Sequence, residues 1–448
     1  MKLRGTMRIN ARGHLEIGGR DAVELAQEFG TPLYVMDEEH IRSICRQYRE
    51  AFIEKHGGEV LYASKAFMTM AICRIVEEEG LGLDVVSGGE LYTAIKAGFP
   101  AQRIFMHGNN KQPEELRMAL EYGVGRIVVD NFWEMEVLNN LAGEMGVAAQ
   151  VLLRVTPGVE AHTHEYIKTG QIDSKFGFTV PNGDALRAVR RCHALPYLQL
   201  KGLHCHIGSQ IFDMDSYGYT AGVMMDLFKT IKDELGLTME ELNLGGGFGI
   251  YYTAGDTPAT VAEYAETVMG VIEKKAEECQ LPLPRVIVEP GRSIVGEAGT
   301  TLYTVGSIKD IPGVRKYVAV DGGMSDNPRP ALYKARYEAM LANKAALPPQ
   351  EVVSITGKCC ESGDMLIWDI ALPAAAPGDI LAVFCTGAYN YSMSMNYNRL
   401  CRPAVVLVRE GKADVIVERE TYEDLLRNDR IPERLKGPYN AVRLALLN

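Results

Sequence analysis

The sequence predicts an α/β fold joined to an all-β part: a (β/α)8 or TIM barrel together with a second, β-rich barrel or sandwich. Three observations support this. Short apolar runs recur eight times with helical stretches between them, which is the pattern of a parallel sheet closed into a barrel. From about residue 296 the apolar runs become β-rich and are separated by Gly/Pro turns. The 448 residues suffice for two such domains.

The first part alternates apolar runs with amphipathic stretches. The eight runs have the length of buried strands, and they begin at Val60, Leu81, Arg103, Arg126, Gln150, Leu200, Leu242 and Val286. Between them, residues 71–79 and 113–122 carry apolar side chains at helical spacing, and Pro113 suits a first helical turn. We expect the barrel to occupy residues 33–295. An open doubly wound sheet is the alternative that the same alternation allows.

The second part has strand-like segments with little helix between them. These segments are residues 316–320, 351–356, 379–384 and 404–408. Residues 7–10 and 14–17, near the start of the chain, are also strand-like, and we expect them to pair with this part. Residues 1–32 and 296–448 are therefore predicted to form one β domain.

Composition excludes several classes of partner. The net charge of -11 argues against binding to nucleic acid or to an anionic membrane, and it favours a small polar substrate. The first 20 residues contain no apolar core of a secretory signal, and no run of eighteen apolar residues exists to span a membrane. Nine scattered cysteines indicate reduced thiols and a cytoplasmic protein.

One short motif resembles a metal site. His204-Cys205-His206 contains three ligand-type side chains, but the spacing is too tight for a tetrahedral site and a second ligand pair is missing. We therefore predict no metal. Both histidines lie on one face of the predicted strand, since side chains alternate along it.

Polar and glycine-rich residues follow the predicted strands at their carboxyl ends, where the active sites of barrels lie. These strand-end segments are Lys65, Asp84-Val-Val-Ser-Gly-Gly-Glu90, His107-Gly-Asn-Asn-Lys111, Arg154-Val-Thr-Pro157, His204-Cys-His-Ile-Gly-Ser-Gln210, Gly245-Gly-Gly-Phe-Gly249 and Glu289-Pro-Gly-Arg292. Packing alone does not explain so many, so we expect them to surround one site.

The strand-end residue types suit a phosphorylated aromatic cofactor. Lys65 has the amine that forms a Schiff base, and because a charged amine attacks poorly we expect its pKa to be lowered. The glycine run at 245–249 lets backbone N–H groups approach a phosphate, to which Ser209 can add a hydroxyl. Glu289 can keep a pyridine nitrogen protonated, as pyridoxal chemistry requires.

Two further side chains can complete this site. Arg292 can pair with a substrate carboxylate or support the phosphate. An imidazole can stack on the flat ring. We favour His206 over His204 for that place, because Gly208 and Ser209 follow it immediately.

Seven motifs together resemble the diaminopimelate decarboxylases, a family of fold type III pyridoxal-phosphate enzymes. The match runs in order from about residue 30 to residue 405. The motifs are Tyr62-Ala-Ser-Lys65, Asp84-Val-Val-Ser-Gly-Gly-Glu-Leu91, His206-Ile-Gly-Ser-Gln210, Gly245-Gly-Gly-Phe-Gly249, Glu289-Pro-Gly-Arg292, Cys360-Glu-Ser-Gly-Asp364 and Gly387-Ala-Tyr389. The resemblance implies the last step of lysine biosynthesis, in which meso-2,6-diaminopimelate becomes L-lysine and carbon dioxide.

The resemblance also implies roles for individual residues. Lys65, His206 and Cys360 would be catalytic, with Cys360 as the proton donor. Pyridoxal 5'-phosphate would be held by Lys65, Asp84, His206, Ser209, Gly245, Gly246, Gly247, Glu289, Gly291, Arg292 and Tyr389. The substrate would contact Arg292, Arg329, Tyr333, Glu361 and Tyr389. In the family Cys360 and Glu361 correspond to residues supplied across a dimer interface, so the β domain would contribute substrate-binding and interface residues of a homodimer.

Some positions depart from the family pattern, and other functions stay open. Asn390 follows Tyr389 where glycine is usual, and Gln112 stands where serine is usual. Cys359 adds a second cysteine directly before Cys360. Decarboxylases of arginine, ornithine or carboxynorspermidine have the same fold, as do amino-acid racemases and non-catalytic carriers of the cofactor. An insertion at 162–178 and the pair Cys360-Glu361 favour a diamino-dicarboxylate as substrate.

Overall fold

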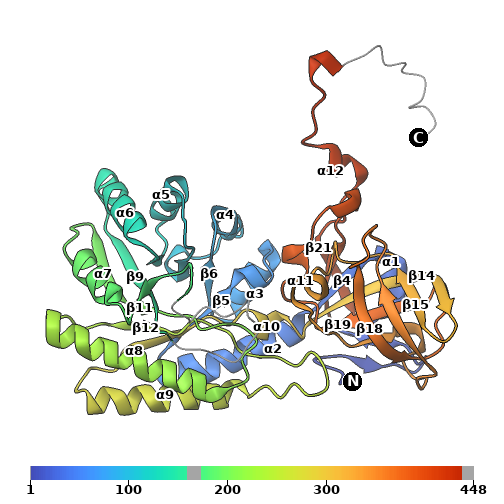
Figure 1. Ribbon diagram of the computed structural model, residues 1–448, viewed down its shortest axis with the longest axis horizontal. Helices are drawn as coiled ribbons and strands as arrows, with labels where there is room; N and C mark the ends of the chain where they lie inside the picture. The colour runs from blue at the N-terminus through green and yellow to red at the C-terminus, as the bar shows by residue number, and fades with distance from the viewer. Residues whose placement is uncertain (1, 159–172, 436–448) are drawn as a thin grey trace.

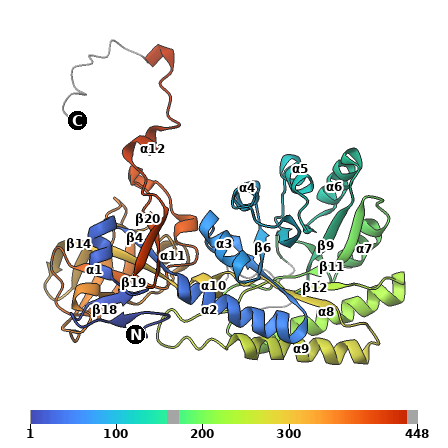
Figure 2. The same ribbon diagram turned by 180° about the vertical axis from the view of Figure 1, so that it is seen from behind.

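The computed structural model describes residues 2–158 and 173–435. Two bodies lie side by side along the long axis, one a barrel wrapped by helices and the other rich in β-structure (Figure 1, Figure 2). The predicted insertion at 162–178 falls mostly on residues 159–172, which lie outside the described residues.

The barrel is a parallel sheet of eight strands, and each begins within two residues of its predicted start. They are β5 (Glu59–Ala63), β6 (Gly82–Val85), β7 (Ile104–Met106), β8 (Arg126–Val129), β9 (Ala149–Thr156), β11 (Leu198–His204), β12 (Glu241–Asn243) and β13 (Arg285–Val288). Each strand pairs with its neighbours in parallel, and the β13–β5 and β8–β9 pairings close the ring. A two-residue strand, β10 (Phe178–Thr179), adds to β9 outside the ring. The predicted barrel is confirmed, and the open sheet is excluded.

Helices cover the outside of the barrel (Figure 1). They are α2 (Glu38–Tyr48), α3 (Met70–Glu78), α4 (Gly88–Lys96), α5 (Pro113–Tyr122), α6 (Phe132–Met145), α7 (Asp184–His193), α8 (Met214–Leu235) and α9 (Val261–Glu278), with a short α10 (Arg292–Val295) after β13. Local chemistry sets their ends. The Thr69 hydroxyl caps α3 by accepting from Ile72 N–H. Helix α5 begins at a proline and stops at Gly123, whose φ of 75° is left-handed.

Apolar side chains fill the interior of the barrel. Leu61, Phe105, Val128, Leu152 and Ile287 form one cluster, and each is at most 1% exposed. They come from five different strands and meet inside the ring, so the barrel is a packed core and not a pore. Polar groups can therefore reach solvent or a ligand only at the two ends of the strands.

The second body contains antiparallel and mixed sheet. Its strands are β4 (Leu33–Asp37), β14 (Gly299–Ile311), β15 (Arg315–Val320), β16 (Ala339–Leu341), β17 (Glu351–Thr356), β18 (Met365–Leu372), β19 (Ile380–Phe384), β20 (Ala404–Arg409) and β21 (Lys412–Val417). The main order is β18-β17-β15-β14-β4-β20-β21, while β19 pairs with β14 and β16. The four predicted strand segments correspond to β15, β17, β19 and β20.

Two details differ from the sequence prediction. Residues 33–37 were assigned to the barrel, but β4 hydrogen-bonds to β14 and β20 in the second sheet. Its continuous apolar run has the same pattern as a barrel strand, so the sequence could not separate the two. The N-terminal strands are predicted to pair with the β domain, but among the described residues β1 (Arg8–Ile9), β2 (Leu15–Ile17) and β3 (Arg20–Asp21) pair with one another in a separate sheet. They belong to that body by packing, since Leu15 and Ile17 are fully buried in its core.

The remaining helices are short. Helix α1 (Ala22–Phe29) follows β3, α11 (Arg329–Tyr333) follows β15, and α12 (Tyr422–Leu426) lies on the C-terminal arm that projects from the second body (Figure 1). Among the described residues, none of the helices is both long enough and apolar enough to cross a membrane.

Candidate active site

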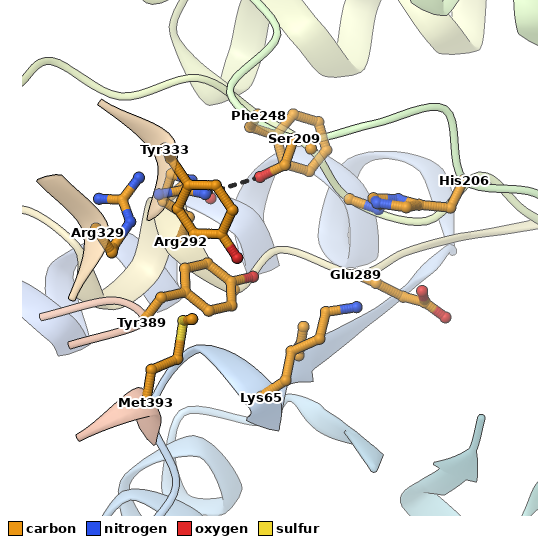
Figure 3. Close-up of a pocket in the computed structure, with 15 residues that line it drawn as sticks. Lys65, His206, Ser209, Phe248, Glu289, Arg292, Arg329, Tyr333, Tyr389 and Met393 are labelled. Atoms are coloured by element: carbon orange, nitrogen blue, oxygen red, sulfur yellow. Dashed lines mark hydrogen bonds between the residues drawn. The ribbon is translucent and has the colours of Figure 1, made fainter. Parts of the chain in front are cut away.

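A cavity of about 230 Å³ lies at the carboxyl ends of the barrel strands, next to the second body. Both bodies line it (Figure 3). The predicted site residues on its wall are Lys65, His206, Ser209, Gly246, Gly247, Glu289, Gly291, Arg292, Arg329, Tyr333 and Tyr389. Residues far apart in the sequence are thus brought to one place.

Lys65 stands directly after β5, in a single turn of 3-10 helix over Ser64–Ala66. Its amine points into the cavity (Figure 3), and the side chain is 42% exposed because the cavity is open. Asp84 Oδ2 lies 4.0 Å from the Lys65 Nζ, and Asp84 is 1% exposed. Burial lowers the pKa of Lys65, but the charges of Asp84, Tyr389 and Glu289 outweigh it and the pKa is raised. The pKa of Lys65 is therefore raised, where the sequence predicts that it is lowered.

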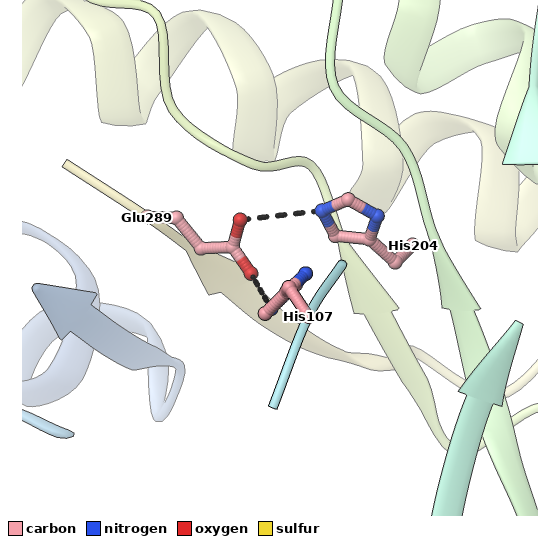
Figure 4. Close-up of side chains that lie close together, drawn as sticks. All are labelled: His107, His204 and Glu289. Carbon is pink, nitrogen blue, oxygen red and sulfur yellow. Dashed lines mark hydrogen bonds and ion pairs between the residues drawn. The ribbon is translucent and has the colours of Figure 1, made fainter. Parts of the chain in front are cut away.

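Glu289 directly follows β13, and three side chains from the ends of other strands hold it, of which Figure 4 shows His107 and His204. Its Oε1 accepts from Asn243 Nδ2 at 2.6 Å and lies 2.9 Å from His107 Nε2. Its Oε2 lies 3.2 Å from His204 Nε2. Burial alone would raise the pKa of Glu289, but the two histidines lower it well below its ordinary value. Glu289 is therefore a buried carboxylate that stays ionised.

The two histidines of the 204–206 motif have different surroundings. His204 is 1% exposed and faces Glu289 beneath the cavity, where burial lowers its pKa to about 4. His206 lines the cavity, and its Nδ1 accepts from Gly246 N–H at 3.2 Å. Burial, followed by the charges of Lys65 and Arg154, lowers the pKa of His206. His206 thus presents a neutral ring to the cavity, with the proton on Nε2.

The glycine loop at 245–247 leaves no room for side chains. A Cβ on Gly246 would collide with the Glu289 carbonyl oxygen, and one on Gly247, whose φ is 106°, would collide with the Gly208 carbonyl oxygen. The N–H groups of Gly245 and Gly246 already donate to Asn243 Oδ1 and His206 Nδ1. In the part of the chain that the structure describes, Gly247 N–H has no such acceptor. Of the three glycines predicted to bind the phosphate, Gly246 and Gly247 line the cavity and Gly245 does not.

Two buried arginines converge on one tyrosine hydroxyl. Arg292 Nη1 donates to Tyr252 Oη at 2.7 Å, and Arg329 Nη1 donates to the same oxygen at 3.0 Å. Each arginine is 7% exposed. Tyr337 Oη lies 2.7 Å from Arg329 Nη1, and Ser209 Oγ lies 2.9 Å from Arg292 Nη2. Within residues 2–158 and 173–435, neither guanidinium has a carboxylate partner, so two positive charges are buried without compensation.

Tyr389 closes one side of the cavity. Its backbone has a φ of 63°, which is uncommon for a residue with a side chain. Its N–H donates to Ala66 O at 2.9 Å, and its ring lies 4.8 Å from the Arg292 guanidinium. The strained turn therefore ties the second body to the Lys65 segment. Asn390, which follows, is fully buried, and its Oδ1 accepts from Tyr337 Oη at 3.5 Å.

Four predicted site residues do not line the cavity: Asp84, Gly245, Cys360 and Glu361. Cys360 and Glu361 are exposed on the loop between β17 and β18. The Cys360 N–H donates to Asn398 Oδ1 at 2.6 Å. This hydrogen bond holds the loop in a place outside the cavity. Within one chain these two side chains do not take part in the site.

Four residues that shape the site were given no role in the sequence prediction. Asn243 and His107 hold Glu289, and Tyr252 and Tyr337 hold the arginines. The sequence gives some indication that His107 and Asn243 lie near the site. His107 ends a predicted strand, and Asn243 lies two residues before the glycine run. Tyr252 and Tyr337 occupy loops whose course the sequence does not specify.

Comparisons with known proteins agree with this geometry. Residues 38–296 match the family model described as "Pyridoxal-dependent decarboxylase, pyridoxal binding domain". The chain is 56% identical over 430 residues to a diaminopimelate decarboxylase of Bacillus subtilis, covering 96% of this chain and 98% of that one.

Solved structures give the same result. The crystal structure of diaminopimelate decarboxylase from M. jannaschii in co-complex with L-lysine superposes with a TM-score of 0.90 at 40% identity, over 96% of this chain and 99% of that one. A lysine/ornithine decarboxylase from Vibrio vulnificus, at 22% identity and a TM-score of 0.75 over 90% of this chain and all of that one, shares the fold. The chain therefore belongs to the diaminopimelate decarboxylase family of pyridoxal-dependent decarboxylases.

Proposed function

We propose that this protein decarboxylates meso-2,6-diaminopimelate to L-lysine and carbon dioxide, with pyridoxal 5'-phosphate as cofactor. The observation that carries this proposal is the pair of buried, uncompensated guanidiniums beside Lys65. Two buried positive charges without a carboxylate partner are costly unless an anion joins them. A substrate that keeps a second carboxylate supplies that anion.

The residues present fit the cofactor. Lys65 offers an amine in the open cavity, Glu289 offers a buried carboxylate, and Gly247 offers a free N–H where no Cβ could be placed. When bound, the cofactor's protonated ring supplies an electron sink for the pair left behind as the substrate's carboxylate departs. The roles of Asp84, Ser209, Gly291 and Tyr389 as cofactor contacts are part of the same proposal.

The chain's own residues would then act in turn. Lys65 would hold the cofactor covalently through its amine, which lies in the open cavity. Glu289, kept ionised by its donors, holds a proton on the ring nitrogen. His206, whose Nδ1 accepts from Gly246 N–H, would stack its neutral ring on the cofactor. Arg292, Arg329, Tyr333 and Tyr389 hold the substrate, with the carboxylate that is retained placed at the guanidiniums.

We further propose a homodimer with shared sites. Cys360 and Glu361 are exposed and lie outside the cavity of their own chain, so they are available to a second copy. Cys360 of the partner subunit would donate the proton that replaces the lost carboxylate, and Glu361 of the partner subunit would bind the substrate. We place the enzyme in the cytoplasm, because all nine cysteines are free thiols.

Subunit mixing tests the shared site. Neither a Lys65→Ala chain nor a Cys360→Ala chain should turn over substrate alone. Mixed dimers should regain part of the activity, because one of their two sites combines an intact Lys65 with an intact Cys360. No recovery in dimers shown to be mixed would mean that each site is built from one chain.

A substrate panel tests the reaction itself. The purified protein with pyridoxal phosphate should release carbon dioxide and L-lysine from meso-diaminopimelate, and little from arginine or ornithine, which lack a second carboxylate. Release from ornithine but not from diaminopimelate would favour a polyamine-pathway decarboxylase. Interconversion of diaminopimelate isomers without carbon dioxide would favour a racemase.

A further inference from the structure

The loop after β7 contains a buried ion pair that the proposed chemistry does not use. Lys111 Nζ donates to Glu134 Oε1 at 2.7 Å, to Gly108 O at 2.8 Å and to Val128 O at 2.7 Å. Lys111 is 2% exposed and Glu134 is not exposed at all. We call Lys111 with these three acceptors the Lys111 clamp.

The clamp joins two strand ends. Gly108 belongs to the loop that follows β7, Val128 belongs to β8, and Glu134 lies in the first turn of α6. Asn131 Nδ2 strengthens the same joint by donating to Asn109 O at 3.1 Å. A buried ion pair contributes little to stability compared with apolar packing of the same volume. All three N–H bonds of the ammonium are used, so the pair fixes geometry.

The fixed segment leads directly to the site. His107 immediately precedes Gly108, whose φ of 123° suits glycine. The His107 Nε2 lies 2.9 Å from Glu289 Oε1 and 3.7 Å from Asp84 Oδ1, and its ring packs edge-on to His204 at 4.8 Å (Figure 4). His107 is 4% exposed. Its contact with Glu289 therefore depends on where the main chain at 107–108 lies.

We propose that Lys111 is a positioning residue, which fixes the main chain at Gly108 against β8 and thereby holds His107 against Glu289. The inference rests on the proposed function, in which Glu289 faces the ring nitrogen of pyridoxal phosphate. Loss of the clamp lets His107 move, so that Glu289 loses one of its three neighbours. The carboxylate is then less well oriented for the ring.

The test compares Lys111→Met with a matched variant at the other end of β8. Arg126 starts that strand and pairs with Glu241 at 2.6 Å, far from the cavity. The dissociation constant for pyridoxal phosphate is titrated on the apoprotein, and the melting temperature is recorded. We expect both variants to melt earlier. Only Lys111→Met should weaken cofactor binding, by about tenfold, as is typical for outer contacts that orient a ligand group, while Arg126→Met should stay within about twofold.

A double-mutant cycle shows whether Lys111 acts through His107. His107→Asn should weaken cofactor binding about as much as Lys111→Met, and the double variant should lose no more than either single one. Losses that multiply, or a Lys111→Met protein with unchanged cofactor affinity, would overturn the inference. Should Lys111→Met not fold, Glu134→Gln keeps the two carbonyl bonds of Lys111 and goes through the same cycle, with a smaller loss expected.

The outcomes separate this inference from the proposed function. If the unmodified protein neither binds pyridoxal phosphate nor decarboxylates diaminopimelate, the proposed function fails. If it does both, and Lys111→Met behaves like Arg126→Met, only the role of Lys111 is refuted.

Discussion

Buried charged side chains have different partners at the two ends of the barrel. At the amino ends of the strands, Glu241 is paired with Arg126 at 2.6 Å and 2.9 Å and also with Arg285. At the carboxyl ends, Arg292 from the barrel and Arg329 from α11 of the adjoining second body are buried against tyrosine hydroxyls. One end of the barrel is complete within the chain, and the other leaves charge for a ligand.

This difference separates stability from function. The pairing at the amino ends lowers the pKa of Glu241 despite its burial, as expected of an ion pair that supports the fold. Buried charge without an opposite charge lowers the stability of the fold at the carboxyl ends. Proteins keep such destabilising groups at sites of binding or catalysis. Variants at the two ends should therefore fail in different assays.

Replacing Lys65 should have the largest effect. Lys65→Ala removes the amine that would hold the cofactor, and turnover should fall by a factor on the order of 10⁴ or more, as for loss of other covalent catalysts. Circular dichroism should stay unchanged, since the side chain is 42% exposed in an open cavity. A Lys65→Ala protein that retains a tenth of its activity would contradict the role.

Neutralising Glu289 should come next. Glu289→Gln keeps the shape but removes the charge, and kcat should fall by about 10² to 10³, as for loss of one preorganised electrostatic group. Glu241→Gln at the opposite end is the matched control and should leave kcat unchanged. Equal losses in the two variants would mean that the barrel ends do not differ.

Removing one guanidinium should affect substrate binding more than chemistry. Arg329→Met should raise KM for diaminopimelate by about 10- to 100-fold, because it deletes one charged hydrogen bond to the retained carboxylate. Steady-state kinetics separate KM from kcat. An unchanged KM would mean that the retained carboxylate does not bind at this arginine.

The bridging hydroxyl should matter less. Tyr252→Phe removes the oxygen that both Arg292 and Arg329 contact, at 2.7 Å and 3.0 Å. Both hydrogen bonds come from charged guanidiniums, and the variant leaves those charges in place, so it misplaces the arginines without removing them. We expect kcat/KM to fall by about three- to tenfold, with little change in melting temperature. A larger loss would show that the hydroxyl contacts the substrate itself.

At the amino ends the expected effect is on stability alone. The folded pKa of Glu241 lies below 4.5, so its ionised form stabilises the fold fully above that pH, and the contribution is lost as pH falls through the folded pKa. Glu241→Gln should cost up to about 3 kcal/mol at pH 7. Thermal melts of the two proteins should converge as the pH is lowered. A difference that persists in acid would exclude the ion pair as its source.

The sequence predicted the barrel well because the signal was repeated. Eight apolar runs at regular spacing placed the strands, and the rule that barrel sites lie at carboxyl strand ends then brought Lys65, His206 and Glu289 together. A single apolar run without regularly spaced neighbours does not show which sheet it joins. For this reason β4 was assigned to the barrel although its hydrogen bonds lie in the second sheet.

What the sequence missed depends on loops and on partners. Tyr252 and Tyr337 come from loops, and only the fold brings their hydroxyls to the arginines. The raised pKa of Lys65 depends on how close Asp84 lies, a distance that no motif encodes. Cys360 is predicted in the site, but in a single chain it is exposed and lies outside the cavity, so its role needs a second copy.

Chemical trapping tests the central claim most directly. The protein loaded with pyridoxal phosphate is reduced with borohydride, digested, and the modified lysine is identified by mass spectrometry. The label should lie on the peptide that contains Lys65, in the open cavity at the carboxyl ends of the strands. A label on Lys111 or on any other lysine, or no label, would contradict this assignment of the site.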